Sequence, residues 1–181
     1  MLIHNITAKT LRVNCGVLAL LSALVYLSWT LGNTSLNTQL FLEINQTVNL
    51  YKTANIWIFI TNLGDASVLI CIALMLIQHQ KTQYTAQLLF AILLVTLATA
   101  ILKQLTDMDR PMKVLGYFPD IFYGEKLSYN SFPSGHTAAA VLLCSFVWLN
   151  KFSKHIVASC LILAVLVAIS RIAVAAHWPA D

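Results

Sequence analysis

Five apolar blocks, each close to the length that crosses a lipid bilayer, constrain this chain more than any other feature. A transmembrane helix needs about 20 predominantly apolar residues. Five blocks meet or approach that length; they are Val13–Leu31, Ile56–Gln78, Tyr84–Leu102, Thr137–Leu149 and Phe152–Ala176. The fourth is short unless it begins near Ser134 and runs past Asn150. They are apolar on all sides, whereas a helix of a soluble protein usually carries a polar face. The blocks predict an all-α, polytopic transmembrane helix bundle with five spans.

Composition supports this prediction. Only 10% of the residues are charged, compared with about 25% in soluble domains. Lys9 and Arg12 precede the first block, as in a signal peptide, but no small-x-small cleavage site follows it. We therefore expect a retained span and one membrane-embedded domain over residues 1–181. The four cysteines lie within apolar blocks without metal-type spacing, which favours a packing role.

Basic residues in short loops predict the orientation of the bundle. With the N-terminus in the cytoplasm, the inner segments carry five basic and no acidic residues, namely Lys9, Arg12, Lys81, Lys151 and Lys154. The outer segments mix acids and bases. This orientation places the long connection Gln104–Pro133 and the end of the last block outside the cytoplasm. A net charge of +4 without a basic cluster on a soluble face does not suggest nucleic-acid binding.

Three segments leave alternatives open. Thr34–Asn55 has apolar residues at helical spacing, which fits an amphipathic helix at the outer interface or a connecting helix packed on the bundle. Asp65 lies in the second block, where an ionisable residue suggests function unless the span starts late and leaves it at the interface. The Gln104–Pro133 connection is rich in aromatic residues, which fits a lipid-entry rim or simple packing.

The first of three polar clusters is Lys103 with Arg110. A separation of seven residues is almost two turns of a helix, so both cations are expected on one helical face. Pro111 then restricts Arg110 and ends the helix. Two cations on one face could clamp a dianion. They could also extend to the interface as anchors, which is the ordinary role of such residues.

The second cluster is Pro133-Ser134-Gly135-His136, directly before the fourth block. Ser134 can cap a helix, and Gly135 lets backbone N–H groups come close to a ligand. A helix N-terminus binds phosphate through its free N–H groups and its dipole. His136 would then lie beside the bound anion. Without the histidine, the same residues would be no more than a good helix cap.

The third cluster contains Arg171, His177 and Asp181 at the end of the last block. A helix beginning near Pro179, or a tight turn, could bring the Asp181 carboxylate to the His177 imidazole. A carboxylate on Nδ1–H fixes the tautomer and leaves Nε2 as a base or nucleophile. The alternative is an interfacial His-Trp pair with a helix-capping aspartate.

Together the clusters read Lys103-x6-Arg110-Pro111, Pro133-Ser134-Gly135-His136 and Ser170-Arg171-x5-His177-x3-Asp181. This pattern resembles the type 2 phosphatidic acid phosphatase family, whose soluble relatives include vanadium haloperoxidases. The resemblance implies that His177 attacks phosphorus to form a phosphohistidine, that Asp181 orients it, and that His136 protonates the leaving oxygen and then activates water. It implies a phosphate site made by Lys103, Arg110, Ser134, Gly135 and Arg171. Neither a metal nor another cofactor is expected.

The resemblance also implies a location and a class of substrate. We expect an enzyme of the bacterial cytoplasmic membrane with its active site on the extracytoplasmic side. The candidate substrates are undecaprenyl diphosphate, phosphatidylglycerol phosphate, phosphatidic acid and lipid A phosphate. A lipid phosphotransferase and a non-catalytic phospholipid-binding or transport protein are the alternatives. The family's membrane fold usually has six spans, and this chain stops at Asp181 where the sixth would begin, so a C-terminally truncated bundle is expected.

Overall fold

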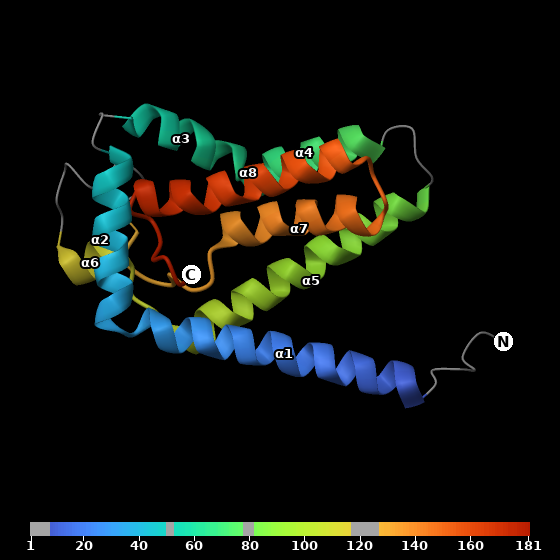
Figure 1. The fold of residues 1–181 in the computed structure, drawn as a ribbon, viewed down its shortest axis with the longest axis horizontal. Helices are drawn as coiled ribbons and strands as arrows, with labels where there is room; N and C mark the ends of the chain where they lie inside the picture. The colour runs from blue at the N-terminus through green and yellow to red at the C-terminus, as the bar shows by residue number, and fades with distance from the viewer. Residues whose placement is uncertain (1–7, 50–52, 78–81, 117–126) are drawn as a thin grey trace.

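The computed structural model describes residues 8–49, 53–77, 82–116 and 127–181, and every regular element in these ranges is an α-helix (Figure 1). The all-α prediction is confirmed for these residues. The helices are α1 (Ala8–Gly32), α2 (Ser35–Asn49), α3 (Ala54–Leu63), α4 (Ala66–Ile77), α5 (Thr82–Thr106), α6 (Pro111–Leu115), α7 (Gly135–Leu149) and α8 (Lys154–Ala173).

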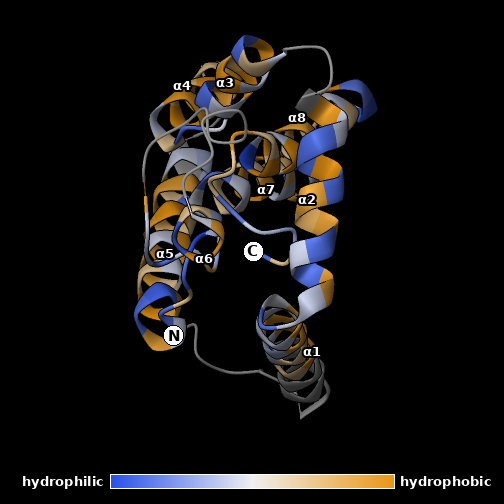
Figure 2. Ribbon diagram, turned by 90° about the vertical axis from the view of Figure 1, so that its left-hand side faces the viewer, coloured by the Kyte–Doolittle hydropathy of each residue, from blue (hydrophilic) through white to orange (hydrophobic). Residues whose placement is uncertain are grey.

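The helices form an elongated bundle crossed by α2 near one end (Figure 1). The C-terminal ends of α5 and α8 and the N-terminal end of α7 gather at this same end. Much of the length of the helices consists of apolar residues (Figure 2), and many large apolar side chains are exposed. Phe90, Leu93 and Met75, for example, are between 62% and 73% exposed. An apolar surface of this extent suits a lipid environment, and the chain is an integral membrane protein.

Two helices in the described ranges are long and apolar enough to span a membrane. They are Tyr84–Leu115, which covers α5 from Tyr84 onward together with α6, and Lys154–Ala173, which is α8. The pair α3 and α4 would form a third, bent span. Two further apolar helices, Ala19–Gly32 and Gly135–Leu149, are shorter. The count of five spans therefore stays a prediction.

The apolar block Ile56–Gln78 contains a break and is not one straight helix. α3 and α4 are bent by 55° relative to each other at Gly64-Asp65. Gly64 lies where α3 meets α8, and a Cβ at this position would come within 2.5 Å of Val167 Cγ1. Asp65 then begins the new helix, since its Oδ1 accepts a hydrogen bond from the Ser67 N–H at 2.8 Å. This is the geometry of an N-cap.

The main core lies between α4, α7 and α8. Its buried residues include Leu69, Leu143, Val147 and Val167, together with small side chains such as Ala164. Small residues let membrane helices approach closely, and α7 and α8 have the most extensive mutual contact among the described helices. This packing fixes the N-terminal end of α7 relative to the C-terminal end of α8.

The segment predicted over Thr34–Asn55 forms α2 and the start of α3, and α2 packs on the end of α8. The Asn45 side chain is 1% exposed and donates hydrogen bonds to the carbonyls of Ile172 at 2.9 Å and Ala173 at 3.0 Å. Asn37 accepts a hydrogen bond from the Ala180 N–H at 3.2 Å. α2 is thus a connecting helix whose buried amides contact the C-terminal segment of the chain.

Candidate active site

The candidate nucleophile follows a tight reversal of the chain after α8. The Ala175 N–H donates to the Ile172 carbonyl at 3.0 Å, and the Ala176 N–H donates to the Arg171 carbonyl at 2.9 Å. These two bonds, with Ala175 at a φ of 56°, form a Schellman motif at the end of the helix. The reversal turns His177 back toward the bundle, where it is only 3% exposed.

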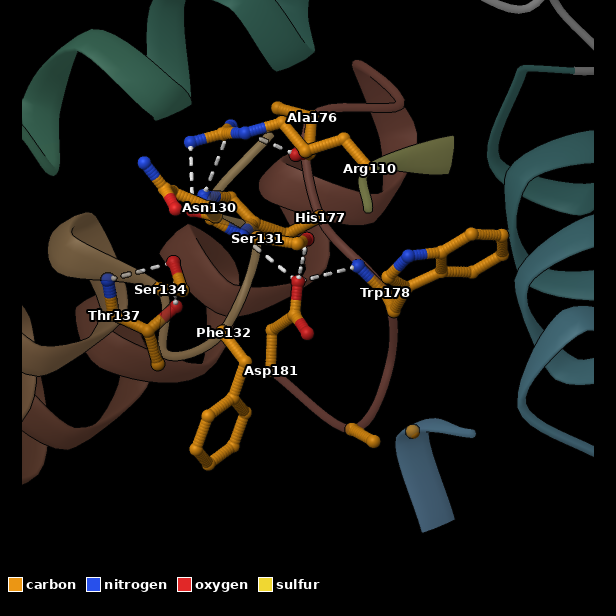
Figure 3. A network of polar contacts seen from close by, with 12 residues as sticks. Arg110, Asn130, Ser131, Phe132, Ser134, Thr137, Ala176, His177, Trp178 and Asp181 are labelled. Carbon is orange, nitrogen blue, oxygen red and sulfur yellow. Dashed lines mark hydrogen bonds and ion pairs between the residues drawn. The ribbon is translucent and has the colours of Figure 1, made fainter. Parts of the chain in front are cut away.

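Asp181 contacts His177 through a tight turn, one of the two geometries that the sequence left open. The Asp181 N–H donates to the Trp178 carbonyl at 3.1 Å. Asp181 Oδ2 lies 2.9 Å from His177 Nδ1 and accepts a hydrogen bond from the Trp178 N–H at 2.9 Å (Figure 3). Because a carboxylate can only accept, Nδ1 carries the proton and Nε2 keeps its lone pair.

Burial lowers the pKa of His177 from its ordinary value of 6.5 to about 4. The Asp181 carboxylate opposes this effect, while Arg110 and Arg171 add to it. His177 is therefore neutral at physiological pH, as a nucleophile must be. Between pH 6.5 and 4 the unfolded chain binds more protons at this position than the folded chain, so His177 makes the protein less stable as the pH falls through this window.

A titration of the histidine rings tests this value. In detergent-solubilised protein with ¹⁵N-labelled histidine, the His177 ring signals are expected to titrate with a midpoint about 2 pH units below that of an exposed histidine. His177→Gln assigns the signals by their loss. A His177 midpoint near its ordinary value of 6.5 would contradict the neutral, buried imidazole.

Arg110 reaches the site from a different backbone geometry than the sequence suggested. The expectation that Lys103 and Arg110 share one helical face is wrong, because α5 ends at Thr106 and Asp107 has a φ of 41°. Arg110 is extended, with φ −80° and ψ 160°, as expected before Pro111. The two cations still meet, since Lys103 Nζ donates to the Asn130 carbonyl at 2.7 Å and Arg110 Nη2 donates to the same oxygen at 3.3 Å.

The Arg110 guanidinium is buried beside His177. Its Nε donates to the Tyr129 carbonyl at 2.8 Å, and its Nη1 donates to the Ala176 carbonyl at 3.0 Å. Nη1 also lies 3.5 Å from His177 Nε2 (Figure 3). A planar guanidinium fixed at this position can bind an anion that approaches Nε2.

Arg171 adds a third positive charge from the last turn of α8. It is 8% exposed, and its Nη1 donates to Thr61 Oγ1 on α3 at 2.7 Å. Lys103 interacts electrostatically with both Arg110 and Arg171 and with the Asp181 carboxylate. Like charges gathered in one partly buried place repel one another, and a bound anion would relieve that repulsion.

The N-terminus of α7 lies beside these cations. Ser134 is its N-cap, and the Ser134 hydroxyl accepts hydrogen bonds from the Thr137 N–H at 3.4 Å and the Thr137 hydroxyl at 3.0 Å. The Ser134 N–H donates to the Asp181 carbonyl at 3.1 Å, which connects α7 to the segment that carries His177 and Asp181. Gly135 begins the helix, and a Cβ on it would meet nothing within 4 Å. The open space faces a helix N-terminus, where phosphate binds well.

Changing Gly135 to alanine tests whether that space belongs to a ligand. The added methyl clashes with no protein atom, so we expect thermal stability to be unchanged or slightly raised. A methyl inside the phosphate position should lower kcat/KM about 100-fold, the effect of losing one anion-stabilising donor. Gly64→Ala is the matched control, because its Cβ meets Val167 and should lower stability instead. Full activity of Gly135→Ala would place the phosphate elsewhere.

His136 lies in the first turn of α7, is half-buried, and lines a cavity of about 290 Å³ between α4, α5 and α7. Gly135 and Asp65 line the cavity with it. Much of the remaining lining is apolar, including Leu69 and Ala73 of α4, Leu88 and Ile92 of α5, and Leu143 of α7. Residues 88–99 of α5 contribute to it, so the cavity follows roughly 16 Å of helix.

Three contacting residues were not singled out by the sequence. The Ser131 hydroxyl donates to Asp181 Oδ2, and Ser131 is fully buried. Asn130 supplies the carbonyl shared by the two cations, and Thr61 contacts Arg171. Of the three, Ser131 could most easily have been suspected from the sequence, since it precedes the Pro133–His136 cluster by two residues. Its partner, however, lies 50 residues away in sequence.

The aromatic connection is only partly covered by the structure. Tyr117, Phe118, Phe122 and Tyr123, on which the lipid-entry rim was based, lie outside the described residues. Phe132 is buried, and Tyr129 is 57% exposed with Lys113 Nζ 4.0 Å from its ring centroid. Within the described ranges, no group of three or more His, Cys, Asp or Glu side chains could hold a metal ion.

Comparison with known proteins identifies the family to which the region containing these residues belongs. The sequence model of the PAP2 superfamily matches residues 84–181, more than half of the chain and every residue of the predicted phosphate and catalytic sites. The chain belongs to the PAP2 superfamily. Thr61, Asp65 and the whole of α2 lie before the matched region.

Two crystal structures of other proteins are similar to this chain. The structure of LpxE from Aquifex aeolicus has a TM-score of 0.69 and 27% identity, over 82% of this chain and 87% of that one. A transmembrane PAP2-type phosphatidylglycerolphosphate phosphatase from Bacillus subtilis has a TM-score of 0.69 and 23% identity, over 90% of this chain and 85% of that one. The second likeness shows the fold alone. Among curated proteins, none shows significant similarity to this chain.

Proposed function

We propose that this PAP2 protein is a membrane phosphatase that hydrolyses a phosphate or diphosphate ester of a lipid at the extracytoplasmic face, through a phosphohistidine on His177. The observation that carries the proposal is the buried His177–Asp181 pair beside Arg110. Asp181 holds Nδ1 at 2.9 Å, and Nε2 lies 3.5 Å from the Arg110 guanidinium. Binding or transport of a phospholipid would require no such nucleophile.

The phosphoryl group would be held by charge and by hydrogen bonds. Lys103, Arg110 and Arg171 neutralise its oxygens, and the Ser134 hydroxyl and the Gly135 N–H add hydrogen bonds at the start of α7. Phosphoryl transfer depends mainly on positioning and on stabilising charge at the equatorial oxygens. Fixed cations, two of them guanidiniums suited to bidentate contact with phosphate, can supply that stabilisation.

In the first step, the Nε2 lone pair of His177 forms a bond to phosphorus while the bond from phosphorus to the lipid oxygen breaks. His136 gives its proton to the departing oxygen. Asp181 keeps the Nδ1 proton in place and balances the positive charge that develops on the His177 ring. The products of this step are a lipid alcohol, or a lipid monophosphate from a diphosphate, and a phosphorylated His177.

In the second step, His136 takes a proton from water, and the water oxygen attacks phosphorus. The phosphorus–nitrogen bond breaks, inorganic phosphate leaves, and His177 recovers its lone pair. His136 returns to its protonated form. Covalent catalysis of this kind divides one difficult displacement into two easier ones.

The cavity beside His136 supports a lipid as the leaving group. A general acid must lie on the side of phosphorus from which the leaving oxygen departs, opposite the nucleophile. The cavity that His136 lines lies between α4, α5 and α7, and its lining is largely apolar. A hydrocarbon chain attached to the leaving oxygen could lie there, whereas a sugar or a nucleoside would lose its hydrogen bonds to water.

Release of inorganic phosphate tests the proposal. Detergent-solubilised protein should be assayed with phosphatidylglycerol phosphate, phosphatidic acid, undecaprenyl diphosphate and lipid A phosphate, with EDTA present throughout. We expect release from at least one lipid and none from His177→Ala. Phosphate that moves to an added lipid or sugar instead of water would indicate a phosphotransferase. Tight binding without turnover of any lipid would overturn the proposal in favour of a binding or transport protein.

A further inference from the structure

Asp65 is a carboxylate in the middle of an apolar block, at the break between α3 and α4. It lines the same cavity as His136, and the two side chains interact electrostatically. Both are half-buried. Among the described residues that line this cavity, Asp65 and His136 are the only ones with ionisable side chains. α5 contributes the neutral Thr96 and Thr99.

Helix capping does not account for the carboxylate. The Asp65 Oδ1 atom caps α4 by accepting hydrogen bonds from the N–H and the hydroxyl of Ser67. Asparagine and serine cap helices about as well as aspartate does, and neither carries a charge. A charge at membrane depth is unfavourable unless it is paired or faces a polar cavity. The cation that His136 becomes when protonated is a partner that would favour aspartate here.

The bend of the helix is what brings this carboxylate to the cavity. A continuous helix over the second apolar block would have no N-cap at Asp65 and would not change direction there. Gly64 permits the close contact with Val167, and α4 leaves this point at 55° to α3. α4 then lines the cavity together with α5 and α7. The break therefore creates both the cavity wall and the position of the carboxylate.

We propose that Asp65 is a positioning residue for His136, orienting the imidazole toward the leaving lipid oxygen and balancing its charge when protonated. This inference rests on the proposed function. The site then has two carboxylate–histidine pairs with different tasks. Asp181 faces a deeply buried imidazole that acts as a nucleophile, and Asp65 faces a half-buried imidazole that carries a proton. When two histidines of one site lie in different environments, one can act as an acid and the other as a nucleophile.

Asp65→Asn is the informative change because it keeps the cap and removes the charge. In single-turnover experiments, this variant should release a lipid alcohol from its phosphate about tenfold more slowly than wild type, within the range attributed to acid catalysis. A nitrophenyl phosphate carrying an alkyl chain has a leaving group that needs no proton. Its release should change less than about twofold, because His136 assists that step little. Asp109→Asn, which removes an exposed carboxylate paired with Lys113, is the matched control.

A double-mutant cycle shows whether Asp65 acts through His136. In a His136→Ala background, Asp65→Asn should have no further effect on release of the lipid alcohol. Multiplicative effects of the two changes would overturn the inference, as would equal effects of Asp65→Asn on both substrates. Normal kinetics of Asp65→Asn with loss of folding in Asp65→Ala would reduce Asp65 to a helix cap. Failure of wild type to release either leaving group would instead refute the proposed function.

Discussion

Replacing His177 with alanine is expected to lower turnover of a lipid phosphate at least about 10⁴-fold, the order of effect seen when a covalent nucleophile is removed. The cations and the α7 N-terminus remain in this variant, so substrate should still bind. The loss should therefore fall on kcat and leave KM little changed.

Chemical trapping distinguishes this role from a structural one. Wild-type protein mixed with ³²P-labelled substrate and quenched in alkali should retain label on His177, because phosphohistidine survives alkali. His177→Ala should retain none. His155→Ala is the matched control, since His155 is an exposed histidine at the opposite end of α8. Substantial turnover by His177→Ala, or label on another residue, would remove His177 from the mechanism.

His136→Ala is expected to slow turnover of a lipid phosphate by roughly 10²- to 10⁴-fold, the range for loss of a general acid–base group. Its effect should depend on the leaving group. With an alkyl-chain nitrophenyl phosphate the first step needs no acid, and His177 should still become phosphorylated. The second step needs a base to activate water. Phosphorylated protein should therefore accumulate.

A burst experiment measures this accumulation. His136→Ala should release nitrophenol rapidly, in an amount equal to the concentration of active sites, and then almost stop. Release of inorganic phosphate should lag behind it. Wild type should release both products at the same steady rate or show a smaller burst. A steady-state rate of His136→Ala equal to that of wild type would exclude His136 as the base, and absence of any burst would exclude rate-limiting dephosphorylation.

The sequence located the helices and the three polar clusters because both depend on local patterns. Ser134 before a helix is a cap in any context, and the structure shows its hydroxyl accepting from the Thr137 N–H. The apolar block before Gly64 is helical for equally local reasons. Whether a Gly-Asp step bends that helix depends on a partner, here Val167 on α8, which lies more than 100 residues further along the chain.

For Lys103 and Arg110, the sequence correctly predicted that the two side chains lie close together but gave the wrong backbone geometry. The two cations meet at the Asn130 carbonyl, but α5 ends between them and the shared helical face does not exist. The contact is created by the 128–130 segment, whose place depends on the fold as a whole. The contacts of Ser131 with Asp181 and of Thr61 with Arg171 could not be predicted from the sequence for the same reason.

The crossing helix α2 makes the segment 172–181, which carries His177 and Asp181, dependent on the first third of the chain. Residues 84–181 contain all the family's signature positions, yet the carbonyls that end α8 receive hydrogen bonds from Asn45, and the turn before Asp181 donates one to Asn37. Residues 84–181, which the family model matches, therefore depend on contacts from outside that region. A chimera that joins residues 84–181 to the first helices of another protein would lack the hydrogen bonds of Asn37 and Asn45. Both asparagines would have to be introduced into the chimera as well.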